Sequence, residues 1–191
     1  MKNLGIVVFD LVEDLDFVGP LEVFGTTSHL RPDSLRPFTV QREGREVKTV
    51  NGLKVIPDYS FLDCPKLNFL LVPGGIGTRT EMKDAVTLEF VKQAANSCEL
   101  VLSVCTGALI LASAGLLNGK RATTHWAAFD ELRAFPQVTV EHLRYVRDGK
   151  IITSAGVSAG IDMALYVTKE LYGAKLCEDV AHDIEYPLRD E

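Results

Sequence analysis

The sequence predicts an α/β fold, a three-layer sandwich with a mostly parallel central sheet and helices on both faces. Two observations lead to this prediction. Uniformly apolar segments of strand length alternate with segments of helical periodicity, which is typical of a parallel sheet covered by helices. The chain has 191 residues, 47% of them hydrophobic, which is enough to form a substantial core. We therefore expect one domain over residues 1–191.

The first third of the chain predicts two strands, a helix and a hairpin. Residues 4–9, "LGIVVF", are apolar and β-branched, as expected for a strand that is buried on both faces. Apolar residues recur at helical spacing over 17–30, and "PFTVQ" (37–41) predicts a second strand. The dipeptide Asn51-Gly52 favours a type I′ turn, so residues 45–58 are interpreted as a hairpin.

The middle of the chain repeats a strand–helix pattern twice. "LNFLLV" (67–72) predicts a buried strand, and the apolar spacing over 80–96 predicts a helix after it. "LVLSV" (100–104) predicts the next strand, and "TGALILASAGLL" (106–117) the next helix.

The last third begins with a short helix over 127–134 and a short extended segment, "VTV" (138–140). Residues 144–154 are interpreted as a second hairpin, with Asp148-Gly149 at its turn. The last predicted element is an amphipathic helix over 158–173 that ends at a glycine.

Composition and charge exclude several classes of function. The formal net charge is −6 and the Lys and Arg residues are scattered, which argues against a nucleic-acid partner. No apolar run approaches the ~20 residues that span a bilayer, and acidic residues interrupt the N-terminal apolar stretch too early for a signal peptide. We therefore expect a cytoplasmic protein without a membrane partner.

The four cysteines, Cys64, Cys98, Cys105 and Cys177, form no CxxC pair and have no His at zinc-finger spacing. We therefore expect reduced thiols and no metal or organic cofactor.

Three informative segments follow predicted strands and converge on one edge of the sheet. They are "DLVEDLDF" (10–17), "PGGIG" (73–77) and "CTG" (105–107). Ligands of open α/β sheets bind outside the carboxyl ends of the strands, so these segments are the expected site.

Cys105 is the candidate nucleophile, because a residue on a sharp strand-to-helix turn projects above the sheet. The start of the following helix is expected to favour the thiolate and lower the thiol pKa. Thr106 adds a hydroxyl, either as a helix cap or as a donor into the site. The alternative is that Cys105 is a small apolar residue that fills the core.

The other candidates come from the neighbouring strand ends. The N–H groups of Gly75 and Thr106 are expected to form an oxyanion hole, although a plain strand-exit turn also explains the glycines. Asp16 is either an N-cap or helix-dipole partner of the helix after it, or an acid beside the sulfur. His125, in "TTHW", follows an extended segment and is either near the site or structural.

Together these segments resemble the ThiJ/PfpI superfamily, which has a flavodoxin-like, class I glutamine amidotransferase-like fold. The similarity extends from "LDFVGPLEVF" through "LLVPGGIG" and "SVCTGALILASAGLLNGKRATTHW" to "DGKIITSAGVSAGIDMAL". The "CTG" and "LDFVGP" forms look most like isonitrile hydratases and the ligand-sensing domains of AraC-type regulators. The resemblance implies Cys105 as the elbow cysteine, Asp16 as the acidic partner of its sulfur, and a homodimer. It also implies the Gly75 and Thr106 amides as anion donors.

Three functions remain open from the sequence. The first is a hydratase or hydrolase of a small molecule, in which Cys105 and an isonitrile form a thioimidate that water converts into an N-formamide. The second is a redox-sensing stress protein, or a glyoxalase or deglycase of the same superfamily. The third is a non-catalytic ligand-sensing domain. A Cys–His protease dyad is disfavoured, because Thr106 stands where protease-like members have histidine.

Overall fold

The computed structural model describes residues 1–188 and contains a seven-stranded sheet in the order β10-β11-β7-β6-β1-β2-β5. Every neighbouring pair in it is parallel except β10 and β11, which are antiparallel. The strands are β1 (Lys2–Val7), β2 (Leu35–Gln41), β5 (Tyr59–Ser60), β6 (Phe69–Val72), β7 (Leu100–Val104), β10 (Tyr145–Asp148) and β11 (Ile151–Ser154).

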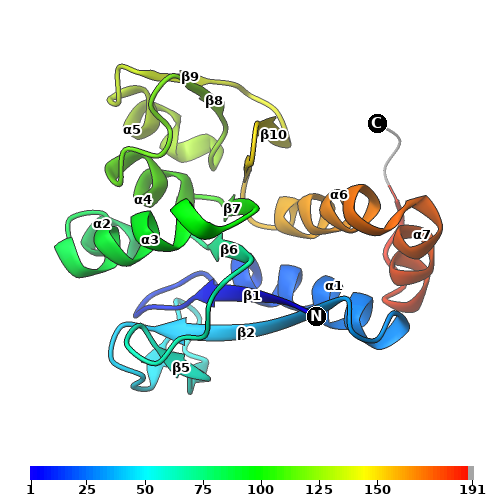
Figure 1. The fold of residues 1–191 in the computed structure, drawn as a ribbon. Coiled ribbons are helices and arrows are strands. Elements are labelled where there is room, and N and C mark those ends of the chain that lie inside the picture. Colours follow the sequence, from blue (N-terminus) through cyan, green and yellow to red (C-terminus); the bar gives the residue numbers. More distant parts are fainter. Residues whose placement is uncertain (189–191) are drawn as a thin grey trace.

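The helices form two groups, one on each face of the sheet (Figure 1). One group contains α1 (Asp14–Leu30), α6 (Ala159–Tyr172) and α7 (Ala174–Asp183). The other contains α2 (Thr78–Glu81), α3 (Ala85–Ser97), α4 (Gly107–Ser113) and α5 (Phe129–Arg133). The predicted α/β sandwich with a mostly parallel sheet is therefore confirmed. Residues 189–191 of the predicted domain lie outside the described residues, and the single-domain assignment stays a prediction.

The central strands are buried along their whole length, which explains why they lack alternation. All residues of β6 and β7 are buried, as expected for strands that have helices on both sides. Two small sheets flank this core. The predicted hairpin around Asn51-Gly52 is the antiparallel pair β3 (Val47–Lys48) and β4 (Lys54–Val55), but the predicted type I′ turn was wrong, because Gly52 has a positive φ and Asn51 does not. The other small sheet pairs β8 (Lys120–Ala122) with β9 (Val138–Val140).

Three predicted helix boundaries were wrong. The helix expected over 80–96 is divided into α2 and α3, because Asp84 caps α3 by accepting a hydrogen bond from the Thr87 N–H at 2.8 Å. The helix expected over 106–117 ends at Ser113. The helix expected from residue 17 begins at Asp14.

Helix α7 was not predicted at all. It begins directly after Gly173, the glycine that ends α6. Its buried residues, Cys177, Val180 and Ala181, have the spacing of one helical face. Because α7 is only ten residues long, its apolar stripe is too short to predict a helix from the sequence. The helix is held by its contacts with α1 and α6.

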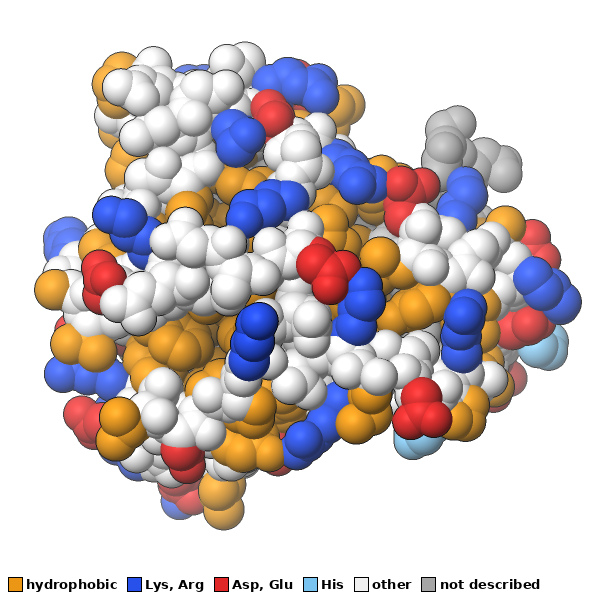
Figure 2. Space-filling model, in the orientation of Figure 1, with side chains coloured by type: hydrophobic (Ala, Val, Ile, Leu, Met, Phe, Trp, Pro, Cys, Tyr) orange, Lys and Arg blue, Asp and Glu red, His pale blue; other side chains and the backbone are white. Residues whose placement is uncertain are grey.

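The surface shows no concentration of positive charge on the face drawn in Figure 2, where Lys and Arg side chains are spread among acidic and neutral ones. Among the described residues, no helix is both long and apolar enough to cross a membrane. All four cysteines are free.

Candidate active site

Cys105 lies on the turn between β7 and α4, at the carboxyl edge of the sheet. Its φ is +56°, a conformation that non-glycine residues rarely adopt, and its side chain is only 7% exposed. Its N–H donates to the Ser154 carbonyl at 3.0 Å, and its carbonyl accepts from the Thr124 hydroxyl at 2.8 Å. The neighbouring strand and loop thus hold the strained backbone of Cys105 in place.

Asp16 lies in the first turn of α1 and is completely buried. The residue that precedes the helix is Glu13, so Asp16 is not the N-cap that one interpretation allowed. Its Oδ2 accepts a hydrogen bond from the Gly74 N–H at 3.0 Å. Its Oδ1 is buried and has no hydrogen-bond partner of ordinary geometry, although the Cys105 thiol lies beside the carboxyl. The Gly74 N–H therefore anchors one carboxyl oxygen, and the carboxyl group interacts with the Cys105 thiol.

The environment raises the pKa of both groups of this pair. Burial raises the pKa of Asp16 from 3.8 to about 7, against the opposing effect of the hydrogen bond from Gly74. Burial also raises the pKa of the Cys105 thiol, and the negative charge of Asp16 raises it further. The N–H and hydroxyl of Thr106 lower the thiol pKa, but they do not outweigh burial. The helix start therefore acts in the predicted direction, but the predicted net lowering of the thiol pKa was wrong, because burial has the larger effect.

Thr106 connects the two strand ends. Its N–H and hydroxyl both interact with the Cys105 sulfur. Its Oγ1 also accepts a hydrogen bond from the Gly75 N–H at 3.0 Å and lies 2.9 Å from the Thr78 hydroxyl. The Gly75 amide is thus already bound to Thr106, whereas the Thr106 amide faces the sulfur. Their roles as oxyanion donors stay predictions.

Gly74 is a site residue that the sequence-based prediction missed in favour of its neighbour. A Cβ at this position would lie 2.5 Å from the Thr106 nitrogen and 2.9 Å from Asp16 Oδ2. Only glycine therefore allows the Gly74 N–H to reach the Asp16 carboxyl. In the sequence, the adjacent glycines Gly74 and Gly75 indicate a tight turn with exposed N–H groups. They do not indicate that the Gly74 N–H faces Asp16 and the Gly75 N–H faces Thr106.

His125 lies close to Cys105, and the side chains of both residues pack against the backbone of Gly156. His125 precedes the 3₁₀ helix η1 (Trp126–Ala128), and its Nδ1 accepts from the Ala127 N–H at 3.2 Å. A Cβ on Gly156 would lie 2.7 Å from the His125 Cδ2 and 2.8 Å from the Cys105 Sγ. The side chains of His125 and Cys105 thus meet at one backbone position. Gly156 was not among the predicted site residues.

The arrangement suits proton transfer to an atom that becomes bonded to sulfur. A buried acid whose pKa is near 7 can hold or release a proton at neutral pH, and the Asp16 carboxyl lies beside the nucleophile. Within residues 1–188, no three His, Cys, Asp or Glu side chains are grouped so that they could hold a metal ion.

The chain is similar in sequence to an enzyme and to a transcriptional regulator. The chain is 40% identical to the isonitrile hydratase of Pseudomonas putida over 184 residues, which are 96% of this chain and 78% of that protein. It is 31% identical to the HTH-type transcriptional regulator CdhR of Pseudomonas aeruginosa, over 87% of this chain and 50% of the regulator. The chain thus corresponds to about half the length of the regulator.

The chain is also similar to a solved structure and matches a protein family. The crystal structure of a ThiJ/PfpI family protein from Pseudomonas syringae superposes with a TM-score of 0.90 at 34% identity, over 99% of this chain and 76% of that one. Residues 2–170 match the DJ-1/PfpI family. The fold, the strand-to-helix cysteine and these matches agree, and the chain belongs to the DJ-1/PfpI family.

Proposed function

We propose that the protein is a cysteine-dependent isonitrile hydratase, which adds water to an isonitrile and forms an N-formamide. One observation carries the proposal: the buried Asp16 carboxyl, with a pKa of about 7, lies beside the Cys105 thiol. The 40% identity to an isonitrile hydratase supports the choice of substrate.

The first step uses the pair when it holds a single proton. The Cys105 thiol first gives its proton to Asp16; the resulting thiolate attacks the terminal carbon of the isonitrile, and Asp16 donates that proton to the same carbon. One C–S bond and one C–H bond form, and a thioimidate, Cys105–S–CH=N–R, results. The Thr106 N–H and hydroxyl stabilise the thiolate before attack.

The second step uses the carboxylate that the first step leaves. Asp16 takes a proton from a water molecule while the water oxygen attacks the thioimidate carbon, and the proton then passes to nitrogen. Collapse of the tetrahedral intermediate breaks the C–S bond and returns the hydroxyl proton to Asp16. The product is the N-formamide, and the thiolate and the acid are restored. In this scheme His125, which packs on Gly156, lines the space for water and substrate.

The proposal extends to the setting in which the enzyme acts. We place it in the cytoplasm as a homodimer without a metal or organic cofactor, as the sequence predicts. Light scattering measures the dimer, and unchanged activity after dialysis against a chelator is expected.

The redox-sensing function is less well supported by the site. Oxidation of cysteine depends on thiolate character and on exposure, and Cys105 is only 7% exposed. We therefore expect the intact mass after mild peroxide treatment to show little oxidation of Cys105. A sensing domain without turnover is distinguished by a metabolite that raises the melting temperature when no isonitrile reacts.

Formation of the N-formamide from an isonitrile, followed by NMR, is the decisive experiment. Cys105→Ala should abolish product formation, whereas Cys64→Ala, at a half-buried thiol of an unrelated segment, should not. Absence of formamide with several aliphatic and aromatic isonitriles would overturn the proposal.

A further inference from the structure

The loop of residues 155–158, between β11 and α6, forms one wall of the thiol site. The Cys105 N–H is bonded to the Ser154 carbonyl at 3.0 Å and lies 3.4 Å from the Ala155 carbonyl. Gly156 packs so closely on the Cys105 sulfur that a Cβ there would be 2.8 Å away. The position of this loop therefore sets both the backbone of the nucleophile and the space around its sulfur.

Arg144 holds both ends of this loop. Its backbone carbonyl accepts the Ala155 N–H at 2.9 Å, and its guanidinium donates to the Ser158 hydroxyl at 3.2 Å. Ser158 occupies the N-cap position of α6, but its side chain does not cap the helix. The Ser158 hydroxyl is instead engaged by Arg144.

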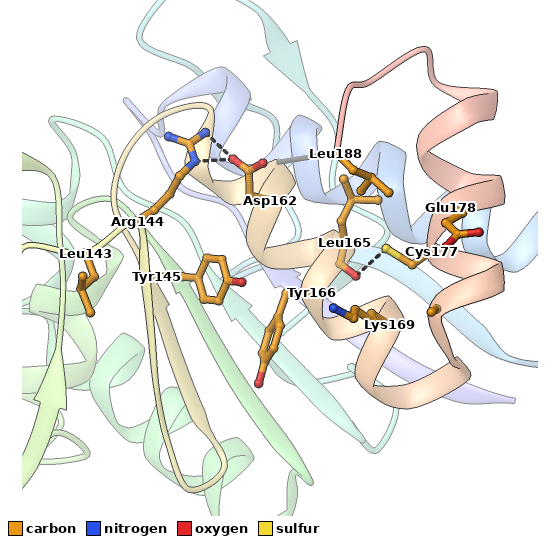
Figure 3. A pocket seen from close by; sticks show the side chains of 11 residues that line it. Leu143, Arg144, Tyr145, Asp162, Leu165, Tyr166, Lys169, Cys177, Glu178 and Leu188 are labelled. Carbon is orange, nitrogen blue, oxygen red and sulfur yellow. Dashed lines mark hydrogen bonds and ion pairs between the residues drawn. The ribbon is translucent and has the colours of Figure 1, made fainter. Parts of the chain in front are cut away.

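The guanidinium of Arg144 is itself fixed by a nearly buried carboxylate. Its Nε and Nη2 contact Asp162 Oδ2 from the first turn of α6, as Figure 3 shows. The Asp162 side chain is 9% exposed, and its Oδ1 accepts a hydrogen bond from the Tyr186 hydroxyl at 3.1 Å. A planar guanidinium can contact Ser158 and Asp162 at once in a fixed geometry, which a lysine ammonium cannot reproduce.

We propose that Arg144 is a positioning residue for Cys105, acting through the loop of residues 155–158. Arg144 acts on the loop and not on the sulfur itself. Through the loop it fixes the position of Gly156 against the thiol. It also fixes the Ser154 and Ala155 carbonyls at the Cys105 N–H. For its turnover readout the inference rests on the proposed hydratase function. A second readout, alkylation of Cys105, does not depend on any substrate.

The surroundings of Arg144 allow informative variants. Arg144 and Asp162 line a cavity of about 730 Å³ between β10, α6 and α7, so a shorter side chain at position 144 meets no clash. Arg147 offers a matched control. It lies on β10, three residues after Arg144, and its guanidinium donates hydrogen bonds to Tyr166 and Glu170 of α6, the helix that Arg144 also contacts. The Arg147 contacts are near the far end of α6, away from the loop.

The experiment compares Arg144→Met, Arg144→Lys, Asp162→Asn and Arg147→Lys with the wild type. We expect Arg144→Met to lower kcat about 10- to 100-fold while KM changes much less, because a displacement of about 1 Å at a nucleophile has such an effect. Arg144→Lys and Asp162→Asn should lower kcat less, and Arg147→Lys should leave it unchanged.

Alkylation by iodoacetamide, followed by mass spectrometry of the Cys105 peptide, gives the independent readout. Loosening the wall exposes the sulfur, so in Arg144→Met the rate at pH 7 should rise severalfold and the pH midpoint should fall. Arg147→Lys should behave like the wild type. The buried Cys98 reports global unfolding, because it lies outside the cavity that Arg144 lines and should not react faster in any variant.

The outcomes separate the two proposals. Wild-type kcat and wild-type alkylation in both Arg144 variants would overturn the positioning role. Equal acceleration at Cys98 and Cys105 would also overturn it, since loss of the fold would then explain the effect. If Arg144→Met does not fold, Arg144→Lys and Asp162→Asn decide by the same measures. A wild-type protein that hydrates no isonitrile refutes the proposed function, and the alkylation series still decides the role of Arg144.

Discussion

Replacing Asp16 with asparagine should make the stability of the protein less dependent on pH. The carboxyl group is fully buried, and burial raises its pKa from 3.8 to about 7. Between these two values the folded state holds a proton that the unfolded state has released. The free energy of unfolding of the wild type therefore falls as pH rises, and the loss is complete above about pH 7.

The size of this effect follows from the pKa shift. One pKa unit corresponds to about 1.4 kcal/mol, so the shift from 3.8 to about 7 corresponds to roughly 4 kcal/mol at most. The asparagine of the variant cannot ionise, and its amide oxygen can still accept from the Gly74 N–H. Relative to the wild type, Asp16→Asn should gain about 2–4 kcal/mol of unfolding free energy between about pH 4.5 and pH 8.

Urea unfolding at about pH 4.5, 6 and 8 measures this difference. Groups that titrate elsewhere cancel between the two proteins, so the pH dependence of the difference belongs to Asp16 and its partner Cys105. Asp14→Asn is the matched control, because Asp14 lies in the same first turn of α1. Burial acts to raise the pKa of Asp14, but hydrogen bonds from Thr49 and Asn51 bring it below its ordinary value.

A carboxyl group with a lowered pKa behaves in the opposite way. The stability that Asp14 contributes is present above its ordinary pKa and is lost only as pH falls through the lowered value. Asp14→Asn should therefore shift stability by a constant amount between about pH 4.5 and pH 8. If the difference between Asp16→Asn and the wild type is equally constant over this range, Asp16 is ionised throughout and the reasoning about its burial is refuted.

Three further predictions concern the thiol and its surroundings. Cys105→Ser should remove turnover while the melting temperature stays close to that of the wild type; measurable hydration by this variant would exclude covalent catalysis. In the wild type, kcat/KM should rise with pH through a midpoint near 7, where the pair loses its first proton, and a profile without this midpoint would contradict the coupling to Asp16. Gly156→Ala should lower kcat about 10- to 100-fold, since the new methyl group displaces the sulfur or the His125 ring. Gly25→Ala, in α1 with no atom within 4 Å of the new methyl group, should instead stabilise by about 0.5–1 kcal/mol without affecting kcat.

Most of the sheet could be predicted from the sequence because its strands are locally distinct. β6 and β7 are buried on both faces, so their sequences are short apolar runs, interrupted only by Ser103, whose length favours strands over helices. The break between α2 and α3 depends on one side-chain cap at Asp84, which a periodic apolar pattern hides. Helix α7 owes its place to contacts with α1 and α6, and neither contact is visible in its own ten residues.

The sequence predicted most residues of the candidate site, but it did not predict the direction in which the pKa of the thiol is shifted. The position of Cys105 follows from the local change of pattern between β7 and α4. The role of Gly156 depends on a backbone that approaches from about fifty residues downstream in the chain, and no local pattern encodes that approach. The thiol pKa depends on burial in the finished fold, which is why the local argument from the helix start gave the wrong direction.

The buried acid connects stability with activity in this protein. A carboxyl group that is ionised in a buried position destabilises the fold, and a protein selected for stability alone would replace it with a neutral residue. The fall in stability ends near pH 7, where the folded Asp16–Cys105 pair loses its first proton, and the same loss creates the singly protonated pair that the proposed mechanism requires. The midpoint of activity should therefore coincide with the pH at which stability stops falling. A midpoint of activity far from that pH would show that different groups control the two properties, and Asp16 would then lose its place as the acid of the reaction.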